Sequence, residues 1–176
     1  MIEISGEISR KDIDRLIKTL GLTENAARAA AKRALLKTAK WTQTRARRAL
    51  SNEMRIQQKL LQARLRLYRR EGGMEQLVWL GLNAFAAKRL GTPRRRAGGT
   101  QVGAHFFEGA FPIKRFGGGV YRRTGRERFP LELAKLPIDE AGAAALRQAA
   151  ERADERLLEV MRQEMEYELS KIIRDK

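Results

Sequence analysis

The chain has 176 residues, the length of one domain, and contains no cysteine, which excludes disulfide bonds, thiol catalysis and cysteine-ligated zinc. Its formal net charge is +16 and its sequence pI is near 11.0, an excess that predicts an acidic partner. Nucleic acid is the first candidate for that partner and an anionic membrane is the second. The N-terminus lacks the apolar core of a signal peptide, and no apolar run reaches the roughly 18 residues of a membrane span. We therefore expect a soluble protein that is not exported, in a reducing cytoplasm.

The basic charge is concentrated in the middle of the chain. Residues 26–70 carry a net charge of +13 and residues 71–130 carry +7, whereas residues 1–25 and 131–176 carry −1 and −3. Uniform charge would indicate solubility alone. This distribution instead predicts one basic surface, with the two ends of the chain serving folding and assembly.

Short elements are expected at the N-terminus. Residues 1–7 alternate apolar and polar side chains, which predicts a strand. Ser9 and Asp12 have the spacing of a capping box, so a short helix is expected to begin there and to end at Gly21. Residues 25–50 are rich in alanine and free of Gly and Pro, which predicts a long second helix.

The long helix separates small side chains from basic ones. Alanines and threonines recur on one side at helical spacing, which lets another backbone approach closely. The other side is basic, and no acidic residue occurs between Glu24 and Glu53. A plain solvated face is the alternative interpretation. Because solvated faces normally mix both signs of charge, we expect this face to meet an acidic partner.

A helix break, a short helix and a hairpin are expected next. Ser51 and Asn52 interrupt the helical pattern, and residues 56–63 predict a short helix. Residues 64–70 alternate and predict a strand with one cationic face, and residues 76–82 predict its partner. The two strands are expected to pair as a hairpin.

Residues 83–96 match no regular element. The proline and glycines around the three arginines at 94–96 predict a loop. Neighbouring guanidinium groups repel one another, so this loop lies either in open solvent or near a negative partner. Residues 100–115 and 119–136 hold aromatic and β-branched side chains, and they predict a second hairpin with glycines 117–119 in its turn.

A final amphipathic helix is expected over residues 139–173. The whole pattern predicts an α+β fold with N-terminal helices, a small antiparallel sheet of β-hairpins in the middle and a long C-terminal helix. We expect a single domain over residues 1–176. Its parts are a mainly helical basic part (1–63), a β part (64–137) and the C-terminal helix (138–176).

The residue types that carry catalysis or metal binding are not brought together by the sequence. His105 has no cysteine or second histidine with which to form a zinc site, so it is expected to be a packed strand residue. Glycines 117–119 are not followed by the Lys-Ser/Thr pair that a phosphate-binding loop requires. Glu164, Glu166 and Glu168 are expected to point in different directions from their helix, which argues against a two-carboxylate active site. We expect no enzyme, no catalytic residue, no metal and no cofactor.

Three segments together resemble a known protein family. They are the basic helix followed by MRIQQKLLQARLRLYRR (54–70), GAHFFEGAFPIK (103–114) and GRERFPLELAKLPI (125–138). In this order they resemble the prophage minor tail protein Z family, the tail completion proteins of long-tailed double-stranded DNA phages. The resemblance extends from about Asp14 to Ile172 and assigns no functional residue.

The resemblance implies a structural virion protein at the head-proximal end of the tail. Such a protein is expected near the tail terminator and the head–tail connector, on the tail tube, after assembly in the host cytoplasm. Related neck proteins are compact α+β subunits that form rings, usually hexameric. The end of the packaged genome is expected to reach into this region.

The charge distribution is compatible with that role, because a ring around double-stranded DNA needs a basic inner wall. Lys and Arg contacts to phosphate are sequence-independent and sensitive to salt. We therefore expect a tail completion subunit in a homo-oligomeric ring that contacts DNA and no membrane. The alternative is a cytoplasmic, sequence-independent nucleic-acid-binding protein outside any virion.

The residues expected to contact DNA are Arg28, Lys32, Arg33, Lys37, Lys40, Arg45, Arg47, Arg48, Arg64, Arg66, Arg69, Arg70, Arg94, Arg95 and Arg96. The apolar residues of the final helix expected at a subunit interface are Leu157, Met161, Met165, Leu169 and Ile172.

Overall fold

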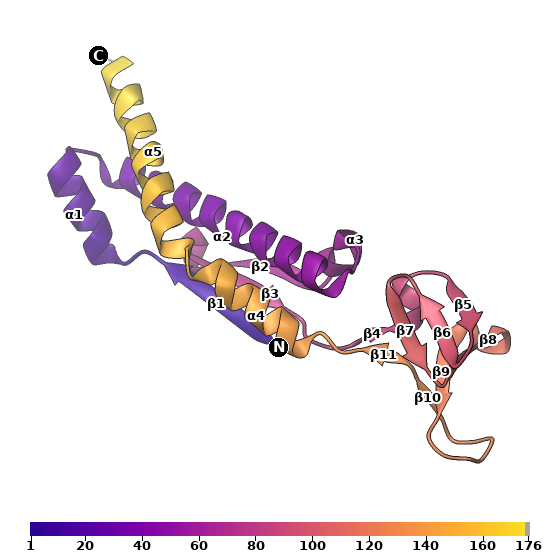
Figure 1. Ribbon diagram of the computed structural model, residues 1–176. Helices are drawn as coiled ribbons and strands as arrows, with labels where there is room; N and C mark the ends of the chain where they lie inside the picture. Colours follow the sequence, from indigo (N-terminus) through magenta and orange to yellow (C-terminus); the bar gives the residue numbers. More distant parts are fainter. Residues whose placement is uncertain (175–176) are drawn as a thin grey trace.

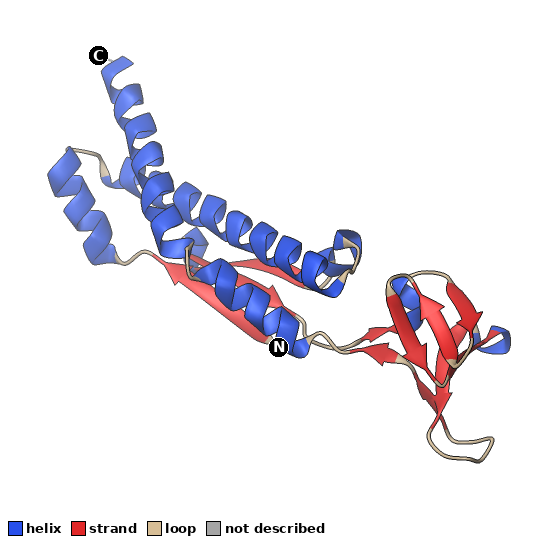
Figure 2. Ribbon diagram, in the orientation of Figure 1, coloured by secondary structure: helices blue, strands red, loops and turns tan. Residues whose placement is uncertain are grey.

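The computed structural model describes residues 1–174, apart from the side chain of Leu16. The chain forms two parts that are joined by a narrow neck (Figure 1). We term residues 1–80 and 139–174 the helical body, and residues 85–136 the β unit. Figure 2 shows that nearly all the helix lies in the helical body and that strands dominate the β unit. No helix within residues 1–174 has the length and apolarity needed to cross a membrane.

The helical body combines one sheet with a layer of helices on one of its faces. Its three-stranded antiparallel sheet has the order β1-β3-β2, and α2 and α4 cover the face that contains Val78 and Leu80. The strands are β1 (Ile2–Glu7), β2 (Leu65–Arg70) and β3 (Glu75–Leu80). The helices are α1 (Arg10–Leu20), α2 (Glu24–Met54), α3 (Gln58–Gln62), α4 (Asp139–Ala150) and α5 (Ala153–Arg174).

Local signals set the ends of α1 as the sequence predicts. The Ser9 hydroxyl accepts a hydrogen bond from the Asp12 backbone N–H, and the Asp12 carboxylate accepts one from the Ser9 backbone N–H. Gly21 ends the helix in the left-handed conformation, with φ of 63°. The predicted strand over residues 1–7 and the predicted hairpin of β2 and β3 are also confirmed.

The predicted break at Ser51 and Asn52 is wrong, because α2 continues through both residues to Met54. Polar residues near a helix end do not interrupt the backbone hydrogen bonds unless their side chains compete for them. Here the Ser51 hydroxyl donates to the Ile56 carbonyl beyond the helix end. The Ser51 side chain therefore stabilises the turn that follows the helix. The chain changes direction at Arg55, whose φ is 48°.

The β unit consists of two three-stranded antiparallel sheets and a two-stranded connection to the helical body. One sheet has the order β5-β6-β7, the other has the order β10-β9-β8, and β4 pairs with β11. The Thr100 hydroxyl donates to the Ala110 carbonyl and links the first sheet to the second. The strands are β4 (Phe85–Ala86), β5 (Pro93–Arg96), β6 (Gly99–Val102), β7 (His105–Glu108), β8 (Ala110–Ile113), β9 (Gly119–Arg123), β10 (Leu131–Leu133) and β11 (Lys135–Leu136).

The α+β class is confirmed, but the strands form several small sheets instead of one. The predicted β part, residues 64–137, is divided in the structure. Strands β2 and β3 pair with β1 inside the helical body, and the separate β unit begins only at Phe85. The sequence pattern did not show this division, because β1 is more than 60 residues away from its partner β3 along the chain.

The C-terminal segment forms two helices instead of the single predicted one. The break lies at Glu151 and Arg152 (Figure 1). Helix α4 places Leu146 in the main hydrophobic core, whereas α5 places Met165 in a second cluster with Ala27 of α2. A change of direction between the two helices lets each apolar face reach its own cluster, and α5 is the long C-terminal helix.

The main core extends from the helical body through the neck into the β unit. It contains Leu50, Leu80 and Leu146 in the helical body and continues through Phe85 to Val120. Phe85 is 1% exposed, although its short strand β4 lies next to the neck (Figure 1). The neck is therefore a packed connection rather than a bare linker.

Candidate nucleic-acid interface

Two of the cations expected on DNA form ion pairs with carboxylates of α5. Arg33 Nε lies 2.5 Å from Glu164 Oε2, and Lys37 Nζ lies 2.5 Å from Glu164 Oε1. Arg33 also binds Glu168, and Lys171 Nζ lies 3.2 Å from Glu168 Oε1. Glu164 and Glu168 are 4% and 7% exposed, so α2 and α5 are joined by a charge cluster whose carboxylates are buried and whose cations are partly exposed. These two cations stabilise the subunit.

The pKa values of Glu164, Glu168 and Arg33 are all shifted in the direction that favours their charged forms. Burial raises the pKa of the Glu164 carboxyl, but hydrogen bonds from Arg33 and Lys37 outweigh it, and the pKa is lowered overall. Burial likewise opposes the charge of Glu168, while hydrogen bonds from Arg33 and Lys171 lower its pKa. Burial lowers the pKa of the Arg33 guanidinium, and the two carboxylates more than compensate.

Replacing Glu164 with Gln is expected to lower the free energy of unfolding by about 2 kcal/mol, because it removes a buried charge that has two cationic partners. The Lys37 side chain is mostly exposed, so water can solvate its charge when the carboxylate is removed. The loss of stability is therefore smaller than for an ion pair that is buried on both sides. Urea unfolding followed by circular dichroism measures the change. Glu166→Gln is the matched control, since Glu166 is exposed on the same helix. Equal losses of stability in the two variants would contradict the conclusion that the ion pairs of Glu164 stabilise the fold.

Acid is expected to loosen the contact between α2 and α5. The pKa values of Glu164 and Glu168 are lower in the folded chain than their ordinary value of 4.5. Their contribution to stability is therefore present above about pH 4.5 and is lost as the pH falls through the folded values. Unfolding measured between pH 6 and pH 3 is expected to show this loss. A Glu164→Gln/Glu168→Gln variant is expected to have a flatter profile, and an unchanged profile would refute the assignment.

The two carboxylates also correct the expectation that Glu164, Glu166 and Glu168 point in different directions. Glu164 and Glu168 are four residues apart, so they lie on the same face of α5 and both bind Arg33. Only Glu166 points elsewhere and is exposed. The pair is an ion-pair site between helices.

The other cations of α2 and β2 have mixed surroundings. Arg28 Nη2 lies 2.7 Å from Glu24, and Arg70 Nη1 lies 3.6 Å from Glu75. Arg45 stacks over the ring of Trp41. Four of the fifteen cations expected on DNA, namely Arg28, Arg33, Lys37 and Arg70, thus form ion pairs within the described residues. The other eleven cations of the predicted set form no ion pair with a carboxylate of the described residues.

The three arginines at 94–96 lie in a strand, so the predicted loop is wrong. They form β5, which pairs with β6 across a tight turn at Ala97 and Gly98. Gly98 has φ of 77°, a conformation that glycine adopts at no steric cost and that closes the turn. All three arginines are exposed. The strand holds them in fixed positions at the surface of the β unit.

The β unit is rich in basic side chains that form no ion pair with a described carboxylate. Residues 85–136 contain twelve Lys and Arg and only three Glu, a net charge of +9. None of these twelve cations forms an ion pair with a carboxylate of residues 1–174. Sequence reasoning included only three of the twelve, those at 94–96. It missed the others because they are spread along the chain in pairs and singles, namely Lys88, Arg89, Lys114, Arg115, Arg122, Arg123, Arg126, Arg128 and Lys135.

The two sheets of the β unit bring distant arginines together. Arg95 of β5 and Arg122 and Arg123 of β9 line one open hollow of about 620 Å³, with Phe111 and Glu108. The Arg123 guanidinium lies 5.7 Å from the centre of the Phe111 ring. Three guanidinium groups and one carboxylate give this open hollow an excess of positive charge, a composition that suits an anionic group such as a phosphate.

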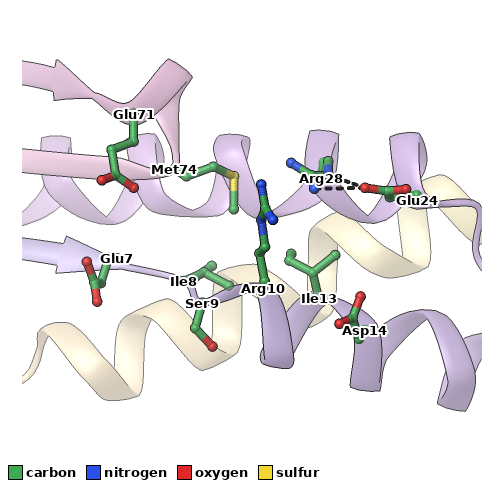
Figure 3. Close-up of a pocket in the computed structure, with 10 residues that line it drawn as sticks. All are labelled: Glu7, Ile8, Ser9, Arg10, Ile13, Asp14, Glu24, Arg28, Glu71 and Met74. Carbon is green, nitrogen blue, oxygen red and sulfur yellow. Dashed lines mark hydrogen bonds and ion pairs between the residues drawn. The ribbon is translucent and has the colours of Figure 1, made fainter.

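A larger hollow in the helical body has the opposite character. It has a volume of about 720 Å³ and lies where β1, α1, α2 and the turn after β2 meet (Figure 3). Figure 3 shows Arg10 pointing from α1 toward α2, while Arg28 is bound to Glu24. Four acidic and two basic residues line the hollow, so it does not favour a polyanion. The acidic residues are Glu7, Asp14, Glu24 and Glu71.

Four of the five apolar residues of α5 expected at a subunit interface pack against other parts of the same chain. Met165 is buried in the second cluster, and Met161, Leu169 and Ile172 pack against that cluster. Leu157 lines a hollow between the sheet and the helices. The packing of these four residues is therefore accounted for by one chain, whereas Leu157 is only partly buried and lies at the hollow. The exposed large apolar residues of α5 are Leu158, Tyr167 and Ile173.

Comparison with known protein families identifies one match over nearly the whole chain. Residues 11–175 match the family described as Prophage minor tail protein Z. Searches of curated proteins and of solved structures found no significant match. The match confirms the resemblance of the three sequence segments named above, two of which lie in or beside the β unit. The chain therefore belongs to the prophage minor tail protein Z family, and it is a phage minor tail protein, a component of the virion tail that assembles with other tail proteins.

Proposed function

We propose that this minor tail protein is a tail completion subunit in the neck of the virion. A ring of copies lies near the tail terminator, the tail tube and the head–tail connector, and it surrounds the end of the packaged double-stranded DNA. The subunit acts by binding, without catalysis, metal or cofactor. The β unit supplies the cations that meet the DNA.

The unpaired charge of the β unit is the observation that supports this role. Cations that already hold carboxylates gain little from phosphate, whereas free cations gain the entropy of counterions released from DNA. In the helical body several basic side chains are held by acidic ones, but in the β unit none of the twelve is held by a described carboxylate. Contacts to phosphate carry no sequence information, which suits a protein that must hold whatever sequence lies at the genome end.

A cytoplasmic nucleic-acid-binding protein outside the virion remains the competing function. It would use the same β unit, so charge alone does not separate the two functions. Membership in a tail protein family favours the virion role. A neck component is expected to form a ring or to purify with tails, whereas the alternative predicts tight binding of nucleic acid by a monomer or a dimer.

Replacing the arginines at 94–96 together with alanine is expected to lower head joining or genome retention, because β5 presents them unpaired at the surface. The infectious yield and electron micrographs of the particles measure the effect. Because all three side chains are exposed, thermal unfolding of the subunit is expected to stay unchanged. A normal infectious yield with full genome retention would show that β5 is not part of the surface that contacts DNA.

A further inference from the structure

The sheet of the helical body has one acidic edge and one basic edge. The order β1-β3-β2 leaves β1 and β2 at the two edges, each six residues long. Strand β1 (IEISGE) carries two glutamates and no cation, whereas β2 (LRLYRR) carries three arginines and no carboxylate. Both edges offer backbone hydrogen-bonding groups to another strand.

Charge on an edge strand is a common protection against unwanted pairing with another chain. That protection works when all the edges of a protein carry the same sign, because equal edges then repel one another. Here the two edges carry opposite signs, so each edge attracts the other edge of a second copy. The charges therefore favour pairing in one specific arrangement instead of preventing it.

The pairing register aligns the opposite charges in rows across the sheet. Residues opposite the same residue of β3 form a row. Read from β1 to β2, the three rows are Glu3–Trp79–Arg66, Ser5–Leu77–Tyr68 and Glu7–Glu75–Arg70. The first and third rows begin with a carboxylate on β1 and end with a guanidinium on β2.

All three rows lie on the sheet face that points away from α2. Successive strand residues point to opposite faces, and Ile4 of β1 and Leu67 of β2 pack against the main core on the other side. The end residues of the rows are exposed, and Tyr68 is 42% exposed. The charged ends are therefore accessible to another copy.

The third row is electrostatically incomplete in one copy. Glu7 and Glu75 are direct cross-strand neighbours, and such like charges repel. The single cation of the row, Arg70, lies 3.6 Å from Glu75 and on the far side of it from Glu7. A cation placed next to Glu7 by another copy would compensate this repulsion.

We infer that copies of this chain assemble head to tail, with β1 of one copy added to the β2 edge of the next. A sheet that continues in register places Glu3 of one copy beside Arg66 of its neighbour, and Glu7 beside Arg70. Pairing of β1 with β1 or of β2 with β2 places like charges together and is disfavoured. Head-to-tail contacts build rings when the rotation closes, so this interface rests on the proposed ring and names the surfaces that form it.

One part of the β2 edge is already occupied. The Gln43 side chain of α2 donates to the Leu65 carbonyl at the first residue of the strand. The available edge therefore starts at Arg66, the residue that ends the first row. The added strand fits between this residue and Arg70.

Engineered cysteines test the interface directly, because the natural chain has none. Ser5→Cys and Tyr68→Cys lie in the central row, with β3 between them. Two strand spacings separate them within one chain by about 9.6 Å, which exceeds the Cα distance of a disulfide. Any disulfide that joins these two positions therefore links different copies.

The oxidised double variant is expected to form a ladder of disulfide-linked multimers on a non-reducing gel. Each single variant can form only dimers, and a mixture of the two single variants is expected to form the mixed dimer. Wild-type rings that are seen by electron microscopy, together with a double variant that forms no ladder, overturn the interface but leave the ring proposal intact. A wild-type chain that stays monomeric at every concentration and with tail proteins present overturns both.

Charge reversal provides a second measurement. Glu3→Lys/Glu7→Lys is expected to weaken association at least tenfold by analytical ultracentrifugation, and adding Arg66→Glu/Arg70→Glu is expected to restore it. Glu151→Lys/Glu166→Lys is the control, with the same change of charge at exposed residues of the helical body. Equal weakening by the control pair, or no recovery on combining the reversals, contradicts the interface.

Discussion

Replacing Arg95, Arg122 and Arg123 together with Gln is expected to weaken binding of duplex DNA at least about tenfold near 0.1 M salt. The three guanidinium groups line one hollow of the β unit and form no ion pair with a described carboxylate, so all of them are free to contact phosphates. Each lost phosphate contact lowers the slope of log affinity against log salt by about 0.9, so the slope is expected to fall by about 2 to 3. Fluorescence anisotropy across a salt series measures both quantities.

The control for this variant removes the same charge from arginines that are already paired. Arg28, Arg152 and Arg156 each lie in an ion pair with a glutamate three or four residues away on the same or an adjoining helical turn. Replacing these three with Gln is expected to change DNA affinity much less. If both triple variants weaken binding equally, the total charge of the chain decides affinity and the β unit is not the DNA surface.

Replacing Phe85 with Ala is expected to lower the free energy of unfolding by about 3 to 5 kcal/mol, the usual cost of removing a buried phenylalanine. Phe85 is 1% exposed, its strand pairs with β11, and the Arg64 guanidinium lies 4.9 Å from its ring centre. Its ring therefore connects the helical body to the β unit. Urea unfolding followed by circular dichroism measures the loss.

Phe129→Ala is the matched control for Phe85, because Phe129 is 60% exposed and lies in the segment that joins β9 to β10. Its replacement is expected to change stability by less than about 0.5 kcal/mol. If the two variants have similar stability, Phe85 does not hold the two parts of the fold together.

The two parts of the molecule divide the tasks of the proposed function. The helical body pairs Arg33 and Lys37 internally and presents sheet edges of opposite charge, which suits assembly. The twelve cations of the β unit form no ion pair with a carboxylate of residues 1–174, which suits contact with DNA. The packed neck around Phe85 links the two.

The amino-acid sequence by itself determined the features that depend on near neighbours. Ser9, Asp12 and Gly21 predicted both ends of α1, because each capping contact involves residues three or four positions apart. The alternation of residues 64–70 predicted β2, because alternation is also a pattern among near neighbours in the sequence. The order of three segments was also enough to indicate the family, since the family match rests on sequence alone.

Only the tertiary structure decided which charges are used inside the subunit and which remain free. Arg33 finds Glu164, 131 residues further along the chain, and no local pattern indicates that pairing. Arg95 and Arg122 line the same hollow because the two sheets of the β unit contact each other through β8. The acidic and basic edges become opposite ends of one sheet only because β1 and β2 both pair with β3. Ion pairs and sheet edges depend on contacts between segments that are distant in the sequence. Composition therefore gives the amount of basic charge, but only the folded chain determines where that charge lies.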